Sequence, residues 1–248
     1  MKFRSFNPTT GAFLREYDFL PSSEIPSRIA ASYRAFQGYR KEPFAERKVR
    51  ILALAQILTR RQEELASLIT QEMGKPIAQA RAEIQKCVQQ CEFTSQQAEM
   101  ILADRPINTE AQRTFVTYEP LGPLLNIMPW NFPVWVPFKG LVPQLAVGNT
   151  ILMKHAPNTP QCALALEEVM HESGWDCGEY QNVFVDTEQV EDIVRHPQVR
   201  GISMTGSSVA GRKVAEVAGR HLKKVVLELG GQDPMLVLED ADLEHAVR

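Results

Sequence analysis

From Thr114 onward the chain alternates short apolar runs with segments of helical periodicity, and this alternation constrains the fold more than any other feature. Apolar runs of strand length cover residues 124–128, 150–153, 181–185, 201–204, 224–227 and 235–238. Segments with helical spacing lie between most of them, over residues 134–145, 161–172, 188–195 and 208–220. Strands and helices that alternate in this way are typical of parallel sheets. We therefore predict an open, mostly parallel α/β sheet with helices on both faces.

The first hundred residues carry a different pattern, which predicts mainly helices. Two short strands are expected within residues 4–19, joined by a turn. A long helix is expected over residues 44–73, because leucine and isoleucine recur there at helical spacing and Gly74 and Pro76 end the pattern. A second helix is expected over residues 77–102. A helical segment therefore precedes the sheet.

Length and composition fit a globular protein of 248 residues, with 44% hydrophobic and 23% charged residues. We expect residues 1–110 to form strands and helices that pack on a sheet domain of residues 111–248.

The net charge of −3 gives no basic surplus, so no nucleic-acid partner is expected. Residues 121–147 are apolar enough for a membrane span, but five prolines and Lys139 favour buried core instead.

The four cysteines predict neither a disulfide framework nor a metal site. Cys87 and Cys91 lie four residues apart on an expected helix, and a metal would need two more ligands nearby. The five histidines show no ligand spacing, and the chain has no CxxC pair. The N-terminus lacks the apolar core of a secretory signal. Together these features favour a cytoplasmic protein without a bound metal.

Polar residues follow four of the expected strands directly. They form the groups Pro129-Trp-Asn131, Lys154-His155, Thr205-Gly-Ser207 and Glu228-Leu-Gly-Gly231. Ligands of parallel α/β sheets bind beyond the carboxyl ends of the strands. The sequence therefore predicts a ligand site to which these four groups contribute.

Three of these side chains suit specific chemical roles. Asn131 stands between two prolines, which hold its amide as a fixed donor toward a developing oxyanion, although an asparagine here also suits an ordinary turn. Glu228 ends an apolar strand and precedes two glycines, which suits proton transfer. Lys154 reaches ribose hydroxyls or a phosphate, or else it is a solvated strand end.

The segment from Gly206 to Lys213 approaches the phosphate-loop pattern without matching it. Arg212 occupies the position of the required lysine, and no serine or threonine follows Lys213, which argues against a nucleoside triphosphatase. Gly206 and Ser207 nevertheless stand where a helix begins, and free backbone N–H groups there suit a pyrophosphate. The chain has no GxGxxG motif, so a dinucleotide would bind in a variant geometry.

These motifs together resemble the aldehyde dehydrogenase superfamily over essentially the whole chain. The resemblance rests on four motifs in order: Met128-Pro-Trp-Asn-Phe-Pro133, Lys154, Met204-Thr-Gly-Ser-Ser-Val-Ala-Gly-Arg212 and Leu227-Glu-Leu-Gly-Gly231. Residues 128–131 and 154–158 are most similar to the succinate-semialdehyde dehydrogenase branch. The resemblance implies a Rossmann-like cofactor domain and the oxidation of an aldehyde to a carboxylic acid.

The resemblance also implies catalytic and substrate-binding roles for three residues. Asn131 would donate its amide to the oxyanion of the thiohemiacetal, and Glu228 would activate the water that hydrolyses the thioester. Lys139 stands where succinate-semialdehyde relatives often carry an arginine for the substrate carboxylate. A lysine provides the charge without the bidentate geometry.

The cofactor implied by the resemblance is NADP⁺ or NAD⁺. Lys154 would contact the adenosine ribose, and Gly206 and Ser207 would lie beside the pyrophosphate. The cleft would be completed by Ile127, Met128, Pro129, Trp130 and Gly230. Pro157 replaces the ribose-binding glutamate of many relatives, so no carboxylate there would repel a 2′-phosphate.

The resemblance places a nucleophilic cysteine downstream of Gly231, where this sequence has none. Cys162 and Cys177 precede the motif and do not replace it. We therefore expect this chain to be the N-terminal portion of such an enzyme and to be inactive alone. The full-length enzyme is expected to act on a small aldehyde and to form a homo-oligomer. The alternatives are a non-catalytic dinucleotide-binding or regulatory fragment, and an assembly role through residues 114–119, which resemble an oligomer-forming strand of the family.

Overall fold

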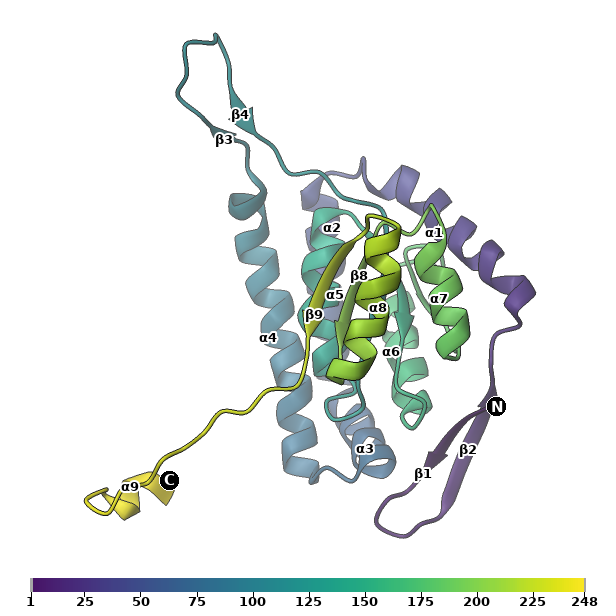
Figure 1. The fold of residues 1–248 in the computed structure, drawn as a ribbon, viewed down its shortest axis with the longest axis vertical. Helices are drawn as coiled ribbons and strands as arrows, with labels where there is room; N and C mark the ends of the chain where they lie inside the picture. The colour runs from purple at the N-terminus through teal and green to yellow at the C-terminus, as the bar shows by residue number, and fades with distance from the viewer. Residues whose placement is uncertain (1, 248) are drawn as a thin grey trace.

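The computed structural model describes residues 2–247, and a five-stranded parallel sheet lies at its centre (Figure 1). The sheet order is β7-β6-β5-β8-β9. Its strands are β5 (Pro123–Ile127), β6 (Thr150–Lys154), β7 (Tyr180–Asn182), β8 (Gly201–Thr205) and β9 (Lys224–Glu228). The chain adds β6 and β7 on one side of β5, then crosses to add β8 and β9 on the other. The predicted Rossmann-like parallel sheet is confirmed.

The register of the sheet brings the carboxyl ends of its strands to one edge. Ile127 pairs with Lys154 of β6 on one side and with Met204 of β8 on the other. Thr205 pairs with Glu228, the last residue of β9. The polar groups that follow these strands therefore share one edge of the sheet, as the sequence predicted.

Helices cover both faces of the sheet, and neighbouring residues of one strand divide between the two cores. Leu124 packs in one core with α5 (Trp135–Val147) and α6 (Pro160–Glu172). Leu125 packs in the other with α1 (Ile25–Tyr39), α7 (Thr187–Arg195) and α8 (Ser208–Arg220). Gly211 lets α8 approach the end of β9, because a Cβ there would lie 2.6 Å from Leu229 Cδ2. The alternation of side chains along a buried strand explains this two-sided burial.

The N-terminal segment begins with an antiparallel hairpin of β1 (Lys2–Phe6) and β2 (Phe13–Asp18), as predicted. A short 3-10 turn, η1 (Ser22–Glu24), leads into α1. Phe3 is fully buried, and its ring stacks on Phe184 with centroids 4.6 Å apart. The hairpin is thereby anchored beside the end of β7.

Helices α2 (Phe44–Arg60), α3 (Gln62–Met73) and α4 (Ile77–Leu102) complete this segment. The bounds of α4 match the prediction, and the left-handed Gly74 ends α3 as expected. The prediction of one continuous helix over residues 44–73 is wrong, because the helix breaks at Arg61. The Arg61 guanidinium there binds Glu64 and also Glu168 and Glu172 of α6. Tertiary ion pairs thus accompany a break that local periodicity does not reveal.

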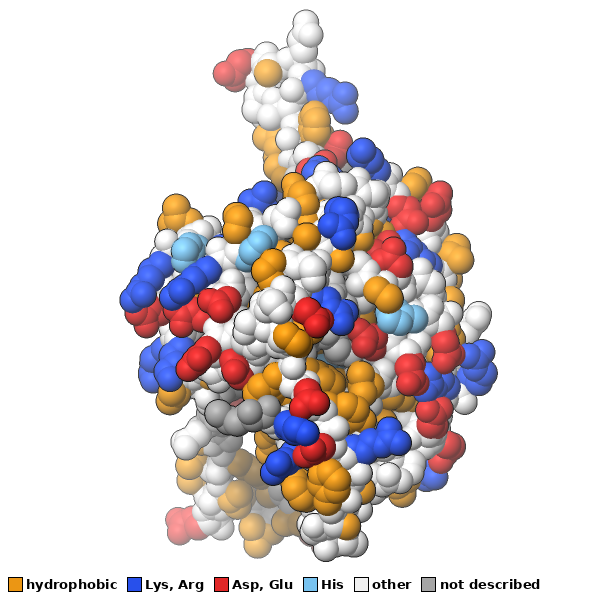
Figure 2. Space-filling model, turned by 90° about the vertical axis from the view of Figure 1, so that its right-hand side faces the viewer, with side chains coloured by type: hydrophobic (Ala, Val, Ile, Leu, Met, Phe, Trp, Pro, Cys, Tyr) orange, Lys and Arg blue, Asp and Glu red, His pale blue; other side chains and the backbone are white. Residues whose placement is uncertain are grey.

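A long hairpin joins the helices to the sheet and stands clear of the body in Figures 1 and 2. Its paired residues form β3 (Arg105–Pro106) and β4 (Phe115–Val116), so the strand expected over residues 114–119 is short. The sixth strand, predicted over residues 235–238, is wrong. These residues form no strand, and their side chains are exposed. They lead away from the sheet to α9 (Leu243–Val247), where they have no neighbouring strand with which to pair.

Candidate functional site

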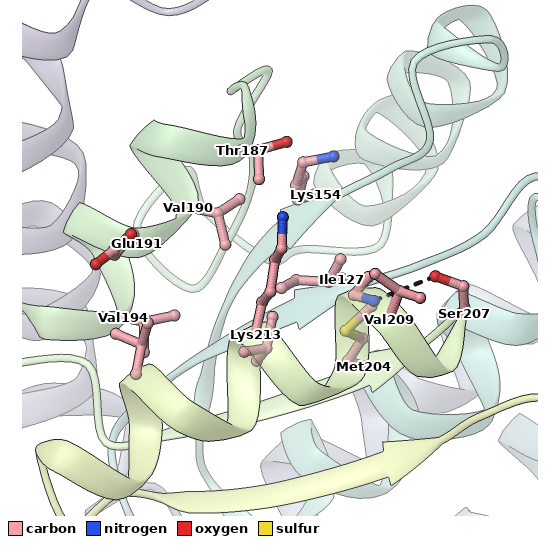
Figure 3. A pocket seen from close by; sticks show the side chains of 13 residues that line it. Ile127, Lys154, Thr187, Val190, Glu191, Val194, Met204, Ser207, Val209 and Lys213 are labelled. Carbon is pink, nitrogen blue, oxygen red and sulfur yellow. Dashed lines mark hydrogen bonds between the residues drawn. The ribbon is translucent and has the colours of Figure 1, made fainter.

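A cavity of about 360 Å³ opens at the carboxyl edge of the sheet, between α7 and α8 (Figure 3). Its floor comes from the ends of β5, β6 and β8, and its two sides come from the helices. It is lined by Ile127, Lys154, Thr187, Val190, Glu191, Val194, Met204, Ser207, Val209, Ala210, Lys213, Val214 and Val217. An apolar lining with a few polar groups at fixed places is typical of small-molecule sites.

Helix α7 is fixed at its start by a capping box. The Asp186 side chain accepts the backbone N–H of Gln189 at 2.8 Å, and Gln189 Oε1 accepts the backbone N–H of Asp186 at 2.9 Å. Gln189 Nε2 also donates to the carbonyl of Leu20 at 2.7 Å. The Asp-x-x-Gln pattern, followed by Val190 and Val194 one turn apart, is the sequence signal that identifies this wall. This wall was not predicted from the sequence.

Lys154, predicted to contact a ribose, lies in the cavity at the end of β6. Its carbonyl accepts the backbone N–H of Met128 at 2.9 Å, and its Nζ donates to the carbonyl of His155 at 3.3 Å. The ammonium also lies 5.9 Å from the ring centroid of Phe3. Burial lowers the pKa of Lys154, against the opposing charge of Asp186. An anion bound in this cavity would therefore stabilise a partly desolvated ammonium.

Gly206 and Ser207 occupy the turn between β8 and α8, as predicted. The Gly206 N–H donates to the carbonyl of Glu228 at 3.0 Å, which ties the turn to β9. Ser207 caps α8, because its Oγ accepts the backbone N–H of Ala210 at 3.2 Å. The start of α8 thus presents backbone N–H groups and a positive partial charge at the cavity, which favours an anion. Ile127 also lines the cavity, whereas Met128 is buried beside it.

The residues predicted for catalysis lie outside this cavity. Glu228 ends β9 with its carboxylate 61% exposed, and its Oε1 lies 3.6 Å from the Nζ of Lys139 on α5. The structure thus brings together the predicted base and the predicted substrate-binding lysine. Asn131 and Trp130 are exposed in the turn before α5, and Pro129 is half-buried. Gly230 is exposed just after β9.

A buried ion pair holds the turn that carries Asn131. Glu83 of α4 accepts the backbone N–H groups of Val134 and Trp135 on Oε1, at 2.9 and 3.0 Å. Its other oxygen pairs with Lys75, whose Nζ lies 3.4 Å from the ring centroid of Phe132. This acid and lysine come from the N-terminal helical segment, far from the motif in sequence. Their contact with the turn of Asn131 was not predicted from the sequence.

The cysteines do not form a reactive site. Cys162 is buried, and burial raises the pKa of its thiol, which keeps it protonated. Cys177 is exposed on the segment between α6 and β7. Within residues 2–247, no group of three or more His, Cys, Asp or Glu side chains is placed to hold a metal ion. In the same range no helix has the length and apolar character to span a membrane.

Comparison with known proteins gives the same family over the whole chain. A model of the aldehyde dehydrogenase family matches residues 1–248. A probable NADP(+) succinate-semialdehyde dehydrogenase of Synechocystis is 40% identical over 248 residues, which cover all of this chain and 55% of that protein. The NADP(+) succinate-semialdehyde dehydrogenase of Deinococcus radiodurans is 41% identical over 99% of this chain and 52% of its own length. The chain spans about half the length of the curated relatives it matches.

Solved structures agree with this fold. The succinic semialdehyde dehydrogenase of Streptococcus pyogenes, crystallised with NADP+, superposes with a TM-score of 0.94 at 30% identity. The match covers 98% of this chain and 53% of that one. A structure of Gox0499, described for its cofactor and substrate selection, has a TM-score of 0.97 at 36% identity, over all of this chain and 54% of its own.

Proposed function

The chain belongs to the aldehyde dehydrogenase family, and we propose that it binds NADP⁺ or NAD⁺ and contributes Asn131 and Glu228 to the oxidation of an aldehyde to its acid. The observation that carries this proposal is the cavity between α7 and α8, with Lys154 and the start of α8 at its polar end. We propose a short carboxylate-bearing aldehyde of the succinate semialdehyde type as substrate. The names of the relatives and the ammonium of Lys139 support this choice.

The residues of the cavity fit such a cofactor. Its valines suit an adenine ring, Lys154 suits the adenosine ribose, and Gly206 and Ser207 suit the pyrophosphate at the start of α8. Pro157 is exposed after β6, and it places no carboxylate against a 2′-phosphate. The NADP(+) relatives favour the phosphorylated cofactor. When bound, the nicotinamide accepts a hydride from the substrate.

The chemical steps assigned to this chain are the stabilisation of charge and the transfer of a proton. Asn131, in the turn held by Glu83, donates its amide N–H to the substrate oxygen that gains negative charge. The exposed carboxylate of Glu228 takes a proton from the water that releases the acid. Trp130, Pro129, Met128 and Gly230 border the same edge of the sheet and would line the path between cofactor and substrate.

The ammonium of Lys139 can pair with either of two carboxylates, that of Glu228 or that of the proposed substrate. It lies 3.6 Å from Glu228, and a substrate carboxylate bound there would compete for the same ammonium. The pair is exposed, so the energy that holds it together is small. A substrate carboxylate that binds Lys139 would therefore separate this lysine from Glu228, and Glu228 would then be free to accept a proton from the hydrolytic water.

Calorimetry on the chain itself tests cofactor binding. We expect measurable binding of NADP⁺ that is at least as tight as that of NAD⁺. Lys154→Met should weaken both, because the lysine faces the ribose that they share. Binding of NAD⁺ alone would contradict the expected cofactor preference, and binding of neither would contradict the proposed function.

A chimera in which the downstream half of the Synechocystis relative follows residue 248 tests the chemistry. We expect it to reduce NADP⁺ with succinate semialdehyde. Glu228→Gln should lower steady turnover by about 10²–10⁴-fold and leave a burst of reduced cofactor, because only the release of the acid needs the base. Glu239→Gln, in the exposed stretch beyond β9, is the matched control. Unchanged turnover in the Glu228 variant would remove this residue from the mechanism.

A further inference from the structure

Lys213 is a second lysine in the cavity, and no role was predicted for it from the sequence. It lies on α8, exposed at the rim, and its side chain extends across the cavity toward Lys154 and Thr187 (Figure 3). The two lysines come from opposite walls, one from the end of β6 and one from the middle of a helix. They are the two lysines of a cavity whose other lining side chains are mostly apolar, five of them valines.

The carboxylates nearby leave both ammonium groups available. Glu191 lines the cavity too, but it forms an ion pair with Arg195 one turn along α7. Asp186 is engaged by the backbone N–H of Gln189 in the capping box. Within residues 2–247, no carboxylate lies within 4.0 Å of the ammonium of Lys154 or Lys213. A ligand anion that contacts both lysines would therefore not have to displace a carboxylate from either ammonium.

The position of Lys213 separates it from the proposed pyrophosphate site. It lies six residues beyond Ser207, which corresponds to about 9 Å along the axis of α8. A pyrophosphate at the start of α8 therefore lies at one end of the cavity, and Lys213 acts on a group deeper between the helices. That group belongs to the adenosine half of the cofactor.

We propose that Lys213 is a specificity-determining residue for NADP⁺, because its ammonium binds, together with Lys154, the 2′-phosphate of the adenosine ribose. This inference rests on the proposed function and adds to it the group that distinguishes the two cofactors. NAD⁺ carries a hydroxyl at the same place and gains nothing from a second ammonium. Lys213 therefore strengthens the binding of NADP⁺ and has no effect on the binding of NAD⁺.

The test is calorimetry at fixed ionic strength on the wild-type chain and on Lys213→Met, which removes the charge and keeps a good helix former. We expect the variant to bind NADP⁺ about tenfold more weakly, and NAD⁺ within about twofold of wild type. Adenosine 2′,5′-bisphosphate should weaken like NADP⁺, and 5′-AMP should not change. Arg212→Met is the matched control, because Arg212 is the exposed neighbour on the same helix and does not line the cavity.

The outcomes separate this inference from the proposed function. Wild-type chain that binds both dinucleotides, with Lys213→Met weakening them equally or not at all, overturns the role of Lys213 alone. An equal loss of NADP⁺ affinity in Arg212→Met also overturns it, because the effect would then come from the general charge of α8. Wild-type chain that binds neither dinucleotide nor adenosine 2′,5′-bisphosphate overturns the proposed function and this inference together.

Discussion

Leu222 adopts a backbone conformation that glycine usually occupies at the end of a helix. Its φ is 52°, its side chain is 96% exposed, and the N–H of Lys223 donates to the carbonyl of Ala218 at 2.9 Å to close α8. A side chain in this conformation costs about 1 kcal/mol, and here it gains no burial in return. We expect Leu222→Gly to raise the free energy of unfolding by about 1 kcal/mol in urea titrations. Leu222→Ala keeps the strained Cβ, and an equal gain in that variant would contradict the explanation.

His155 makes stability depend on pH. It is fully buried beside Lys154, neither ring nitrogen has a hydrogen-bond partner within residues 2–247, and burial lowers its pKa to about 3. Between pH 6.5 and 3 the unfolded chain binds a proton that the folded chain does not, so stability falls as the pH falls.

The measurement is urea unfolding at pH 7 and pH 5. We expect His155→Leu to lose about 2 kcal/mol less stability than the wild type between these two values. Equal losses in the two proteins would show that His155 is not the group responsible.

At the scale of elements, α5 depends on an acid from another helix. Glu83 is fully buried, and it accepts the first N–H groups of α5 while it pairs with Lys75. Glu83→Ala leaves those groups and a buried ammonium without a partner, so we expect unfolding to require about 3–5 kcal/mol less. The control is Glu63→Ala on α3, which removes the exposed partner of Arg81 on α4, and its urea midpoint should stay at the wild-type value. Matching losses in both variants would contradict a special role for Glu83.

Element bounds were predictable where local signals decide them. The start of α4 was predictable because Pro76 precedes its first residue, and the end of α3 at Gly74 was predictable because glycine accepts a positive φ. The break at Arg61 was missed because its ion pairs involve Glu168 and Glu172, more than a hundred residues away. Local sequence patterns reflect residues that are close in the chain, so they do not reveal partners that are distant in sequence.

The part of the candidate site that lies at strand ends was predictable from the sequence, and the part on α7 and α8 was not. The shared location of Lys154, Ser207 and Glu228 at one edge of the sheet was predictable because the strand ends of a parallel sheet share an edge. Val190 and Lys213 were missed because only the crossover that places β8 beside β5 makes α7 and α8 neighbours. On its own helix each residue has the spacing of an ordinary helix face. The roles of the predicted site residues, the boundary near residue 110 and assembly into a homo-oligomer stay predictions.

For the whole molecule, we expect self-association at high concentration. Apolar side chains are exposed beyond the edge strand β9, with Leu236 85% and Leu238 67% exposed, whereas acidic and basic side chains are interspersed over the face seen in Figure 2. An edge strand with exposed apolar residues beside it favours association. Light scattering should show larger species, and the double change Leu236→Asp with Leu238→Asp should reduce them. Val49→Asp, at an exposed valine of α2, is the control. A wild-type monomer at high concentration would contradict the expectation.

The central position of β5 in the sheet affects how the protein folds during synthesis. β5 is synthesised before the other four strands of the sheet, and the edge that pairs with β8 stays unpaired until β8 has been made. At ordinary rates of synthesis that wait lasts several seconds, while β6 and β7 already have the edge they need. The nascent chain therefore exposes an unpaired strand edge for this time, and shielding that edge from other chains is part of folding this protein correctly.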